Sequence, residues 1–276
     1  MGIIVPSSYA LSAEGVAHGW KPVIGWHNLA TTSTLTTTYE NASYPATNLA
    51  NPRTNSVWKS GSLLAQKITV LFGAEYDVDY AALARHNLGT GACPTSIQGL
   101  AAGGDPDIDG DWTELVASQV LADNSPAMFR FTKQGLIGVR YALTPVATQP
   151  QAAVVHVGEL LVLDKGLPEG HIPITYGRNV TKASPISQGG DMLGRIVQTA
   201  SLSSSIVQED LDPDWYRENL EPFRAACDED YFFFAWSPQS YPAEVGYCEV
   251  TNDPKPVINR KTGHISISFE IAGLAV

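Results

Sequence analysis

The sequence predicts a mainly β protein built from two parts. Of its 276 residues, 44% are hydrophobic and only 16% are charged, against roughly a quarter charged in typical soluble domains, so a substantial core is expected. The 24 glycines and 18 prolines favour many short elements over long helices. Several segments alternate apolar and polar residues with period two, as strands with one buried face do. These observations favour sandwiches or barrels over a parallel α/β sheet.

Strand signals recur along the whole chain. They cover residues 67–72, 128–131, 136–143, 154–163, 196–207 and 263–273. The last is the clearest, because its apolar residues alternate with Ser and Glu; they are Ile265, Ile267, Phe269 and Ile271. The Thr-rich residues 31–38 predict either a strand or an exposed connection, since β-branched residues suit strands without requiring one.

One kinked helix is expected at about residues 212–227. Asp212 can cap it, and Pro213 suits the first helical position. Its apolar stripe consists of Tyr216, Leu220, Phe223 and Cys227. Pro222 interrupts the middle, so a kink is expected there. Residues 209–230 hold nine acidic and two basic side chains, which indicates either a solvated helix surface or a face that repels an anion or meets a basic partner.

A domain boundary is expected near residues 165–170, which are rich in Gly and Pro. It separates a first part, residues 1–165 with an N-terminal extension of about residues 1–40, from a second part, residues 166–276.

Charge and cysteine content exclude several classes of protein. The net charge is −11, without a Lys/Arg cluster, which disfavours sequence-specific nucleic-acid binding. No apolar stretch approaches the ~20 residues of a membrane span, and the N-terminus lacks the basic region of a signal peptide. The three cysteines are far apart and lack C-x-x-C spacing, so reduced thiols in a protein made in a cytosol are expected.

The sequence contains no recognisable catalytic motif, and no enzyme activity is predicted. It lacks G-x-S-x-G and the Gly-rich phosphate-binding loops, and its six histidines are dispersed without zinc-binding spacing. No cofactor is expected apart from calcium. Asp105, Asp107 and Asp109 begin a D-x-D-x-D-G segment that resembles a calcium loop. Val116 stands where that loop needs a bidentate Glu, so an acidic hairpin turn is the other interpretation.

Aromatic residues supply the candidate interface. Residues 231–236 form a run too apolar to remain in water, so it must meet another domain or another subunit. The expected interface residues are Tyr216, Phe223, Phe232, Phe233, Phe234, Trp236 and Tyr241.

Motifs of the first part resemble discoidin-like domains of the coagulation factor 5/8 C-terminal type, over roughly residues 40–165. The matching segments, in serial order, are residues 44–49, 57–60, 68–73, 80–88, 111–115, 139–141 and 158–160. The resemblance implies an eight-stranded jelly-roll sandwich, often used to bind carbohydrate, lipid or protein at its loop tips. The candidate ligand-binding residues are Trp26, His86, Asn87 and Trp112.

Motifs of the second part resemble tail-tip and baseplate proteins of tailed bacteriophages. The matching segments are residues 190–195, 212–226, 231–238, 241–248 and the closing strand. The resemblance implies a β-barrel-like domain with one helix that assembles as a trimeric or hexameric ring around the tail axis. Distal tail proteins usually place the ring-forming domain first, so the order here is reversed. An iron–sulfur cluster, carried by some related hub proteins, is not expected because this part holds only Cys227 and Cys248.

The predicted function is therefore structural: a minor tail protein of the virion, made in the host cytoplasm, that links the tail tube to host-recognition parts of the baseplate. Its expected partners are copies of itself and other tail-tube and baseplate proteins. The alternative is a carbohydrate-binding adsorption protein that contacts host surface glycan through the discoidin-like loops. A cell-wall-degrading tail enzyme is the third hypothesis, and no motif supports it.

Overall fold

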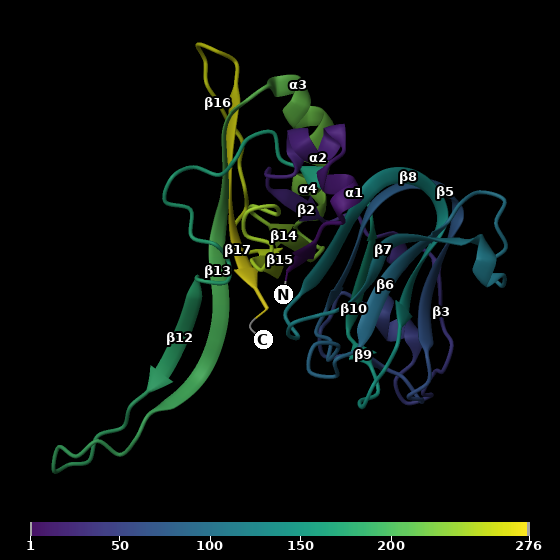
Figure 1. Cartoon of the computed structure of the whole chain (residues 1–276). Coiled ribbons are helices and arrows are strands. Elements are labelled where there is room, and N and C mark those ends of the chain that lie inside the picture. The colour runs from purple at the N-terminus through teal and green to yellow at the C-terminus, as the bar shows by residue number, and fades with distance from the viewer. Residues whose placement is uncertain (1, 275–276) are drawn as a thin grey trace.

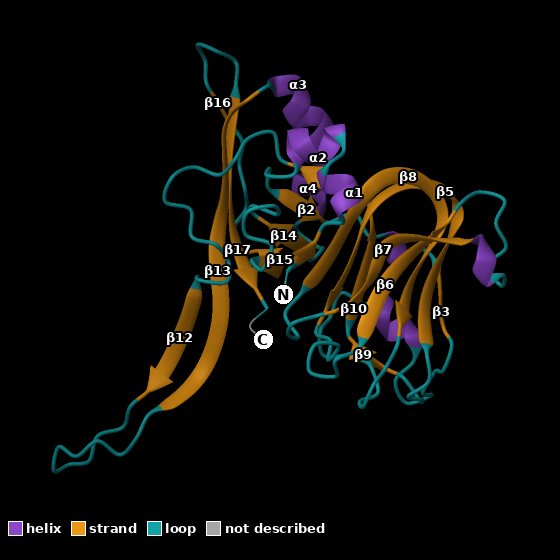
Figure 2. Cartoon of the chain, viewed as in Figure 1, coloured by secondary structure: helices purple, strands orange, loops and turns teal. Residues whose placement is uncertain are grey.

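A computed structural model describes residues 2–274, apart from the side chain of Thr199. The chain forms a β-sandwich and a second sheet that lies against it (Figure 1). A helical segment covers the opposite face of the second sheet, and strands dominate throughout (Figure 2). The prediction of a mainly β chain with a sandwich and one kinked helix is confirmed. Among the described residues, no helix is long and apolar enough to cross a membrane.

The sandwich is built on two long strands that curl around one core. Its sheet has the order β10-β5-β8-β6-β7, with β1 beside β8 and β3 beside β5. The bounds are β1 Ile3–Ile4, β3 Thr34–Thr37, β5 Gln66–Ala84, β6 Pro94–Leu100, β7 Trp112–Val120, β8 Ala127–Leu143 and β10 Val154–Gly158. The β5–β8 register breaks between Leu71 and Tyr76, and Ile68 and Leu83 from opposite sides of the break point into the same core. The Thr-rich segment is a strand.

Short elements close the ends of the sandwich. They are the 3₁₀ turns η1 Leu29–Thr31, η2 Ala46–Ala50 and η3 Asp109–Asp111, and the paired strands β4 Trp58–Lys59 and β9 Gln151–Ala152. The helices α1 Ser7–Ala10 and α2 Ala13–His18 precede them in the chain.

The second sheet is open and has the order β11-β2-β14-β15-β17-β13-β12, with β16 beside β17. The bounds are β2 Val23–Gly25, β11 Leu161–Val162, β12 Arg178–Ala183, β13 Ile196–Leu211, β14 Phe232–Ala235, β15 Val245–Val250, β16 Val257–Ile258 and β17 Ile265–Gly273. The alternation predicted for β17 is confirmed, because Ile265, Ile267, Phe269 and Ile271 are all buried. The prediction of a barrel-like second part is wrong. The second sheet stays open, and the sandwich covers one of its faces while the helical segment covers the other.

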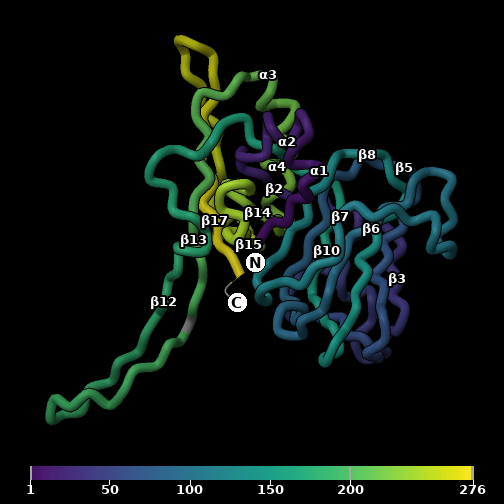
Figure 3. Tube along the Cα trace, in the orientation of Figure 1, coloured from purple at the N-terminus to yellow at the C-terminus, as the bar shows by residue number. Residues whose placement is uncertain are grey.

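The predicted division at residue 165 also differs from the structure. Strand β2 pairs with β11 and β14, so residues before the sandwich belong to the second sheet. Apart from β1, which pairs with β8, the strands of the sandwich therefore lie between β2 and β11 in the chain, and Figure 3 shows the N-terminal residues running beside the C-terminal half. Pairing between distant strands, rather than the Gly/Pro-rich connection, defines the boundary.

The helical segment follows β13 directly. It comprises α3 Pro213–Trp215, a π-helical turn η4 Tyr216–Leu220 and α4 Glu221–Ala226. Asp212 caps it as predicted, since its Oδ1 accepts the backbone N–H groups of Asp214 and Trp215 at 2.9 and 3.0 Å. The π turn ends just before Pro222, which lacks the N–H that regular α-helix would require.

A separate apolar cluster joins the sandwich to the second sheet. Tyr80 and Met128 of the sandwich meet Phe233 and Tyr247 of the second sheet. A Cβ atom on Gly25 would lie 2.7 Å from the Tyr80 ring, so the two sheets approach more closely there than a side chain allows.

Candidate functional site

The most unusual surface is a β-hairpin arm, residues 178–201. It comprises β12, the connecting residues 184–195 and the first part of β13. Strand β13 pairs with β17 from Leu211 only as far as Leu202, which lies opposite Gly273, and continues with β12 alone. Figure 1 shows this ribbon projecting well away from both sheets. Local hydrogen bonding shapes its tip, where Ser187 donates its N–H to the Asp191 carbonyl at 2.9 Å.

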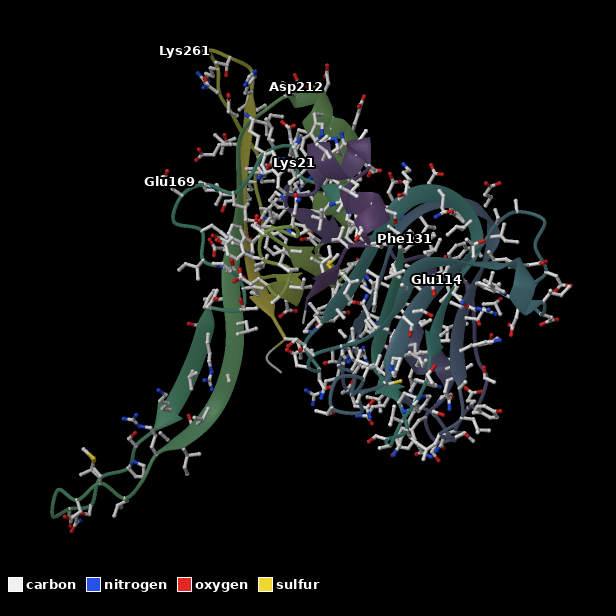
Figure 4. All side chains as sticks on the ribbon, viewed as in Figure 1. Lys21, Glu114, Phe131, Glu169, Asp212 and Lys261 are labelled. Carbon is white, nitrogen blue, oxygen red and sulfur yellow. The ribbon has the colours of Figure 1, made fainter. Side chains whose placement is uncertain are left out.

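The arm exposes apolar side chains that the rest of the chain leaves uncovered. Figure 4 shows side chains projecting from it into solvent. Met192 is 91% exposed, and the other large apolar residues exposed on the arm are Ile186, Leu193, Ile196 and Val197. A two-stranded hairpin is at best marginally stable alone in water. The arm therefore has the properties of a surface that becomes covered by a partner.

Charge differs between the arm and the helical segment. The arm carries three basic residues, Arg178, Lys182 and Arg195, and one acidic residue, Asp191. Residues 209–230 carry nine acidic and two basic residues. The exposed carboxylates there include those of Asp212, Asp214, Glu218, Asp228, Glu229 and Asp230. The two surfaces are thus of opposite sign.

Within the acidic segment, one carboxylate is firmly held. Arg224 Nε donates to Glu221 Oε2 at 2.9 Å, and the Tyr216 hydroxyl donates to the same oxygen at 2.6 Å. The hydrogen bonds from Arg224 lower the pKa of Glu221 to about 2. The Glu221 carboxylate therefore stabilises the helical segment itself, as Asp212 does by capping it and Asp214 does by its ion pair with Arg217 at 3.1 Å. The exposed carboxylates of Glu218, Asp228, Glu229 and Asp230 remain available for a partner.

Most of the predicted interface residues lie inside the chain. Tyr216, Phe223, Phe232 and Phe234 are buried between the second sheet and the helical segment, while Phe233 is buried against the sandwich. For these five, a contact with another subunit is wrong, because the side chains of β14 alternate between the helical segment and the sandwich, and Tyr216 and Phe223 pack from the helical segment onto the second sheet. Trp236 is partly buried and stacks on Tyr241 with ring centroids 5.0 Å apart. Tyr241 is 51% exposed.

The predicted ligand-binding residues do not form one site. His86 and Asn87 lie near the start of β6, whereas Trp112 pairs with Leu100 at its far end, about 20 Å away at the usual rise per strand residue. Trp26 packs on Phe223 under the second sheet, with ring centroids 6.2 Å apart.

Three of these side chains have structural hydrogen bonds. His86 Nε2 lies 2.9 Å from the Ser125 carbonyl oxygen, and burial lowers the pKa of His86 to about 4. Asn87 bridges loops by bonding to Gln149 and Gln151. The Trp112 indole donates to the Pro106 carbonyl at 3.1 Å. These contacts hold loops in place rather than presenting groups to a ligand.

The acidic loop at residues 105–111 is an exposed turn with internal hydrogen bonds. Asp105 Oδ1 accepts the N–H of Asp107 at 2.9 Å. Asp109 forms ion pairs with Lys67 and with Arg140 Nη1, the latter at 2.9 Å. Across the part of the chain that the structure describes, no three His, Cys, Asp or Glu side chains are grouped as metal ligands. The calcium hypothesis gains no support from this geometry.

The arm residues were missed as functional residues by sequence reasoning. Residues 196–207 read as an ordinary strand with apolar positions, and only half of that strand lies in the sheet core. The available signal was the Gly-Gly-Asp turn at residues 189–191. Between two strand patterns, it marks a hairpin.

No family model and no curated protein matches the sequence. Solved carbohydrate-binding modules are similar in structure. Chitosan-binding module 1 of a chitosanase/glucanase from Paenibacillus sp. IK-5 is 21% identical, with a TM-score of 0.42 over 48% of this chain and 99% of the module. A family 32 module of Clostridium perfringens NanJ, in complex with galactose, is 18% identical with a TM-score of 0.40, over 47% of this chain and 96% of the module.

Proposed function

We propose that this chain is a structural subunit that assembles with copies of itself through its β-hairpin arm. The observation that carries the proposal is the ribbon of residues 178–201, which leaves the sheet and exposes apolar side chains on a two-stranded hairpin. Unpaired strand edges and apolar patches of this kind are typical of association surfaces. Covering them with a partner stabilises the arm and buries the apolar tip.

Charge complementarity supports a second copy as the partner. The basic arm of one subunit and the acidic segment 209–230 of another attract each other, which favours encounter and orientation. A contact between two different surfaces of the same chain is heterologous, and such contacts generate rings when the rotation closes. The second part resembles phage tail-tip proteins, and this resemblance supports a location for the proposed ring around the tail axis of the virion, between the tube proteins and the baseplate proteins.

The position of β2 supports the same assignment. Distal tail proteins usually begin with their ring-forming domain, and β2 of the second sheet precedes the sandwich in this chain. The domain order is therefore less reversed than the sequence indicates, because the second part begins with β2 and most of the sandwich is inserted after it.

Native mass spectrometry across a concentration series tests the proposal. We expect a discrete oligomer for the wild-type chain and a shift to monomer for the double variant Met192→Asp, Leu193→Asp. Val257→Asp is the matched control, because Val257 is an exposed apolar residue on a different hairpin. A wild-type monomer at every concentration, or oligomers unaffected by the arm variant, would contradict self-assembly.

Carbohydrate binding by the sandwich is a second candidate function. The chitosan- and galactose-binding modules named above are examples of this activity, and here two exposed rings favour it. Tyr39 and Tyr44 are 38% and 41% exposed in one tight loop, closed by the Asn41–Tyr44 bridge. Exposed aromatic rings provide flat apolar faces with a polar edge, which suit stacking on sugars.

A glycan array tests this second candidate. We expect binding of the wild-type chain to be lost in the double variant Tyr39→Ala, Tyr44→Ala. Tyr76→Ala is the control, because Tyr76 is equally exposed, at 43%, but lies on the bend of β5. Absence of glycan binding by the wild-type chain, or equal loss in Tyr76→Ala, would contradict this candidate.

A further inference from the structure

A cavity of about 430 Å³ lies where the N-terminal segment passes between the sandwich and the residues that follow β14. Its apolar lining consists of Ile3, Ile4, Val5, Pro238, Pro242 and Ala243. Among the described residues that line it, Arg130 of β8 alone carries a charge. An apolar cavity of this size with a few polar groups is typical of a small-molecule site.

Arg130 is buried without a hydrogen-bond partner. Its side chain is 1% exposed, and Nε, Nη1 and Nη2 all lack a partner. The Tyr9 ring covers one face of the guanidinium, 4.7 Å from Cζ, a contact worth about 2 kcal/mol or more when it is buried. The N–H donors at the edge of the guanidinium stay unsatisfied. Because Arg keeps its proton in proteins, such a group strongly favours an anion beside it.

The acids near Arg130 leave this demand unmet. Asp79 lies within electrostatic reach of Arg130, but its Oδ1 accepts the Leu160 N–H at 2.7 Å. Glu14 Oε1 accepts the Tyr9 hydroxyl at 3.3 Å. The Glu14 carboxylate, and the Asp79 carboxyl group where it is ionised, repel further negative charge, so the cavity suits a singly charged anion better than a phosphate dianion.

We propose that this cavity binds a small monocarboxylate with an apolar body, with the carboxylate on Arg130 and the body against Pro238, Pro242 and Ala243. The planar fork of Arg donors matches a carboxylate in bidentate geometry. This site is separate from the arm and does not depend on assembly.

Tyr9 forms a movable cover in this proposal. The guanidinium nitrogens are buried beneath its ring, so the carboxylate reaches them when Tyr9 turns aside. Tyr9 belongs to α1, a helix of 4 residues without a side-chain N-cap. Such a short helix is weakly stable by itself, so the packing of the Tyr9 ring, which is 1% exposed, is what a bound carboxylate must displace.

Isothermal titration of the full chain with benzoate tests the site, with benzamide as the neutral probe of the same shape. We expect benzoate to bind and benzamide not to bind. Arg130→Met should weaken benzoate binding by about tenfold or more, the usual loss for a hydrogen-bonded charged group. Arg178→Met, at an exposed arginine of the arm, should leave binding unchanged.

Two further variants separate loss of the site from loss of the fold. Ala243→Phe fills the cavity from an exposed position and should abolish binding while Arg130 remains. Tyr9→Ala removes the cover and should tighten binding. Circular dichroism checks that each variant is folded.

Two further probes then distinguish the source of the carboxylate. Binding of glucuronate would indicate an acidic sugar, and binding of a short apolar peptide with a free but not an amidated C-terminus would indicate a peptide terminus. The proposal is overturned if no carboxylate binds, if inorganic phosphate alone binds, or if folded Arg130→Met binds benzoate as the wild type does.

Discussion

The imidazole ring of His156 meets the edge of Phe233, with ring centroids 5.1 Å apart, and so joins β10 of the sandwich to β14 of the second sheet. His156 Nδ1 lies 3.3 Å from the Gly25 carbonyl oxygen. A titratable ring thus sits at the centre of the contact between the two parts, completely enclosed by protein.

Acid should weaken the fold through His156. Burial lowers its pKa to about 4, below the ordinary value near 6.5. As pH falls from about 6.5 to about 4, His156 becomes protonated in the unfolded chain but stays neutral in the folded chain. The free energy of unfolding therefore falls by up to about 3 kcal/mol. Urea unfolding over this pH range measures the effect.

His156→Asn should show a shallower pH dependence than the wild type in that series. His86, whose pKa burial also lowers to about 4, acts in the same direction, and His86→Asn isolates its share. Asp79 acts oppositely, because burial raises its pKa to about 7, so its contribution to stability is lost progressively as pH rises from about 4 to about 7. Parallel curves for the wild type and His156→Asn would contradict the prediction.

Phe233→Ala should lower the free energy of unfolding by about 3–5 kcal/mol, as truncation of a buried Phe does. Its side chain is 0% exposed and contacts His156 and Tyr247. Tyr241→Ala, at a ring that is 51% exposed, should cost less than about 1 kcal/mol. Urea denaturation of both variants checks the contrast, which equal losses would refute.

Gly25→Ala should lower the free energy of unfolding by about 1–3 kcal/mol, because overpacking forces neighbours to shift. Its Cβ would lie 2.7 Å from the ring of Tyr80, whose hydroxyl donates to the His27 carbonyl at 2.8 Å and cannot easily move. Gly73→Ala is the control, with nothing within 4 Å of the added atom. Similar thermal midpoints for both variants would mean that the sheets can separate at Gly25 at little cost.

Replacing residues 184–195 by an Asn-Gly turn should leave the unfolding free energy of the monomer within about 0.5 kcal/mol of wild type, as for surface changes in general. The removed side chains are nearly all exposed. Guanidinium unfolding, measured at a dilution where both chains are monomeric, checks this. A large loss would show that the arm stabilises its own subunit.

Local patterns predicted individual elements well. The alternation in β17, the Asp212 cap and the interruption near Pro222 depend on neighbours in sequence, and each is present in the structure. Strand pairing between distant segments could not be predicted in this way. Strand β2 is only Val-Ile-Gly, too short to show a period, yet it connects β11 to β14.

The candidate site was harder to predict for the same reason. The pattern of the aromatic run at residues 231–236 predicts contact with another domain or another subunit but does not distinguish them, and the chain itself covers both faces of β14. Conversely, Ile196 and Val197 belong to a predicted strand, and the pattern does not reveal that both are exposed on the arm. Arg130 lies between Phe129 and Phe131 in an apolar strand, and the sequence does not reveal that its donors lack a partner.

The position of most of the sandwich, residues 26–160, between β2 and β11 has an evolutionary consequence. The chain leaves the second sheet after Gly25 and returns at Leu161, and Ile24 and Leu161 are direct neighbours in the sheet. Any module whose own ends lie close together fits the same two attachment points. Recombination that exchanges residues 26–160 as a cassette leaves the arm, the second sheet and the helical segment unchanged, and strand β1, which pairs with β8, lies outside the exchanged segment.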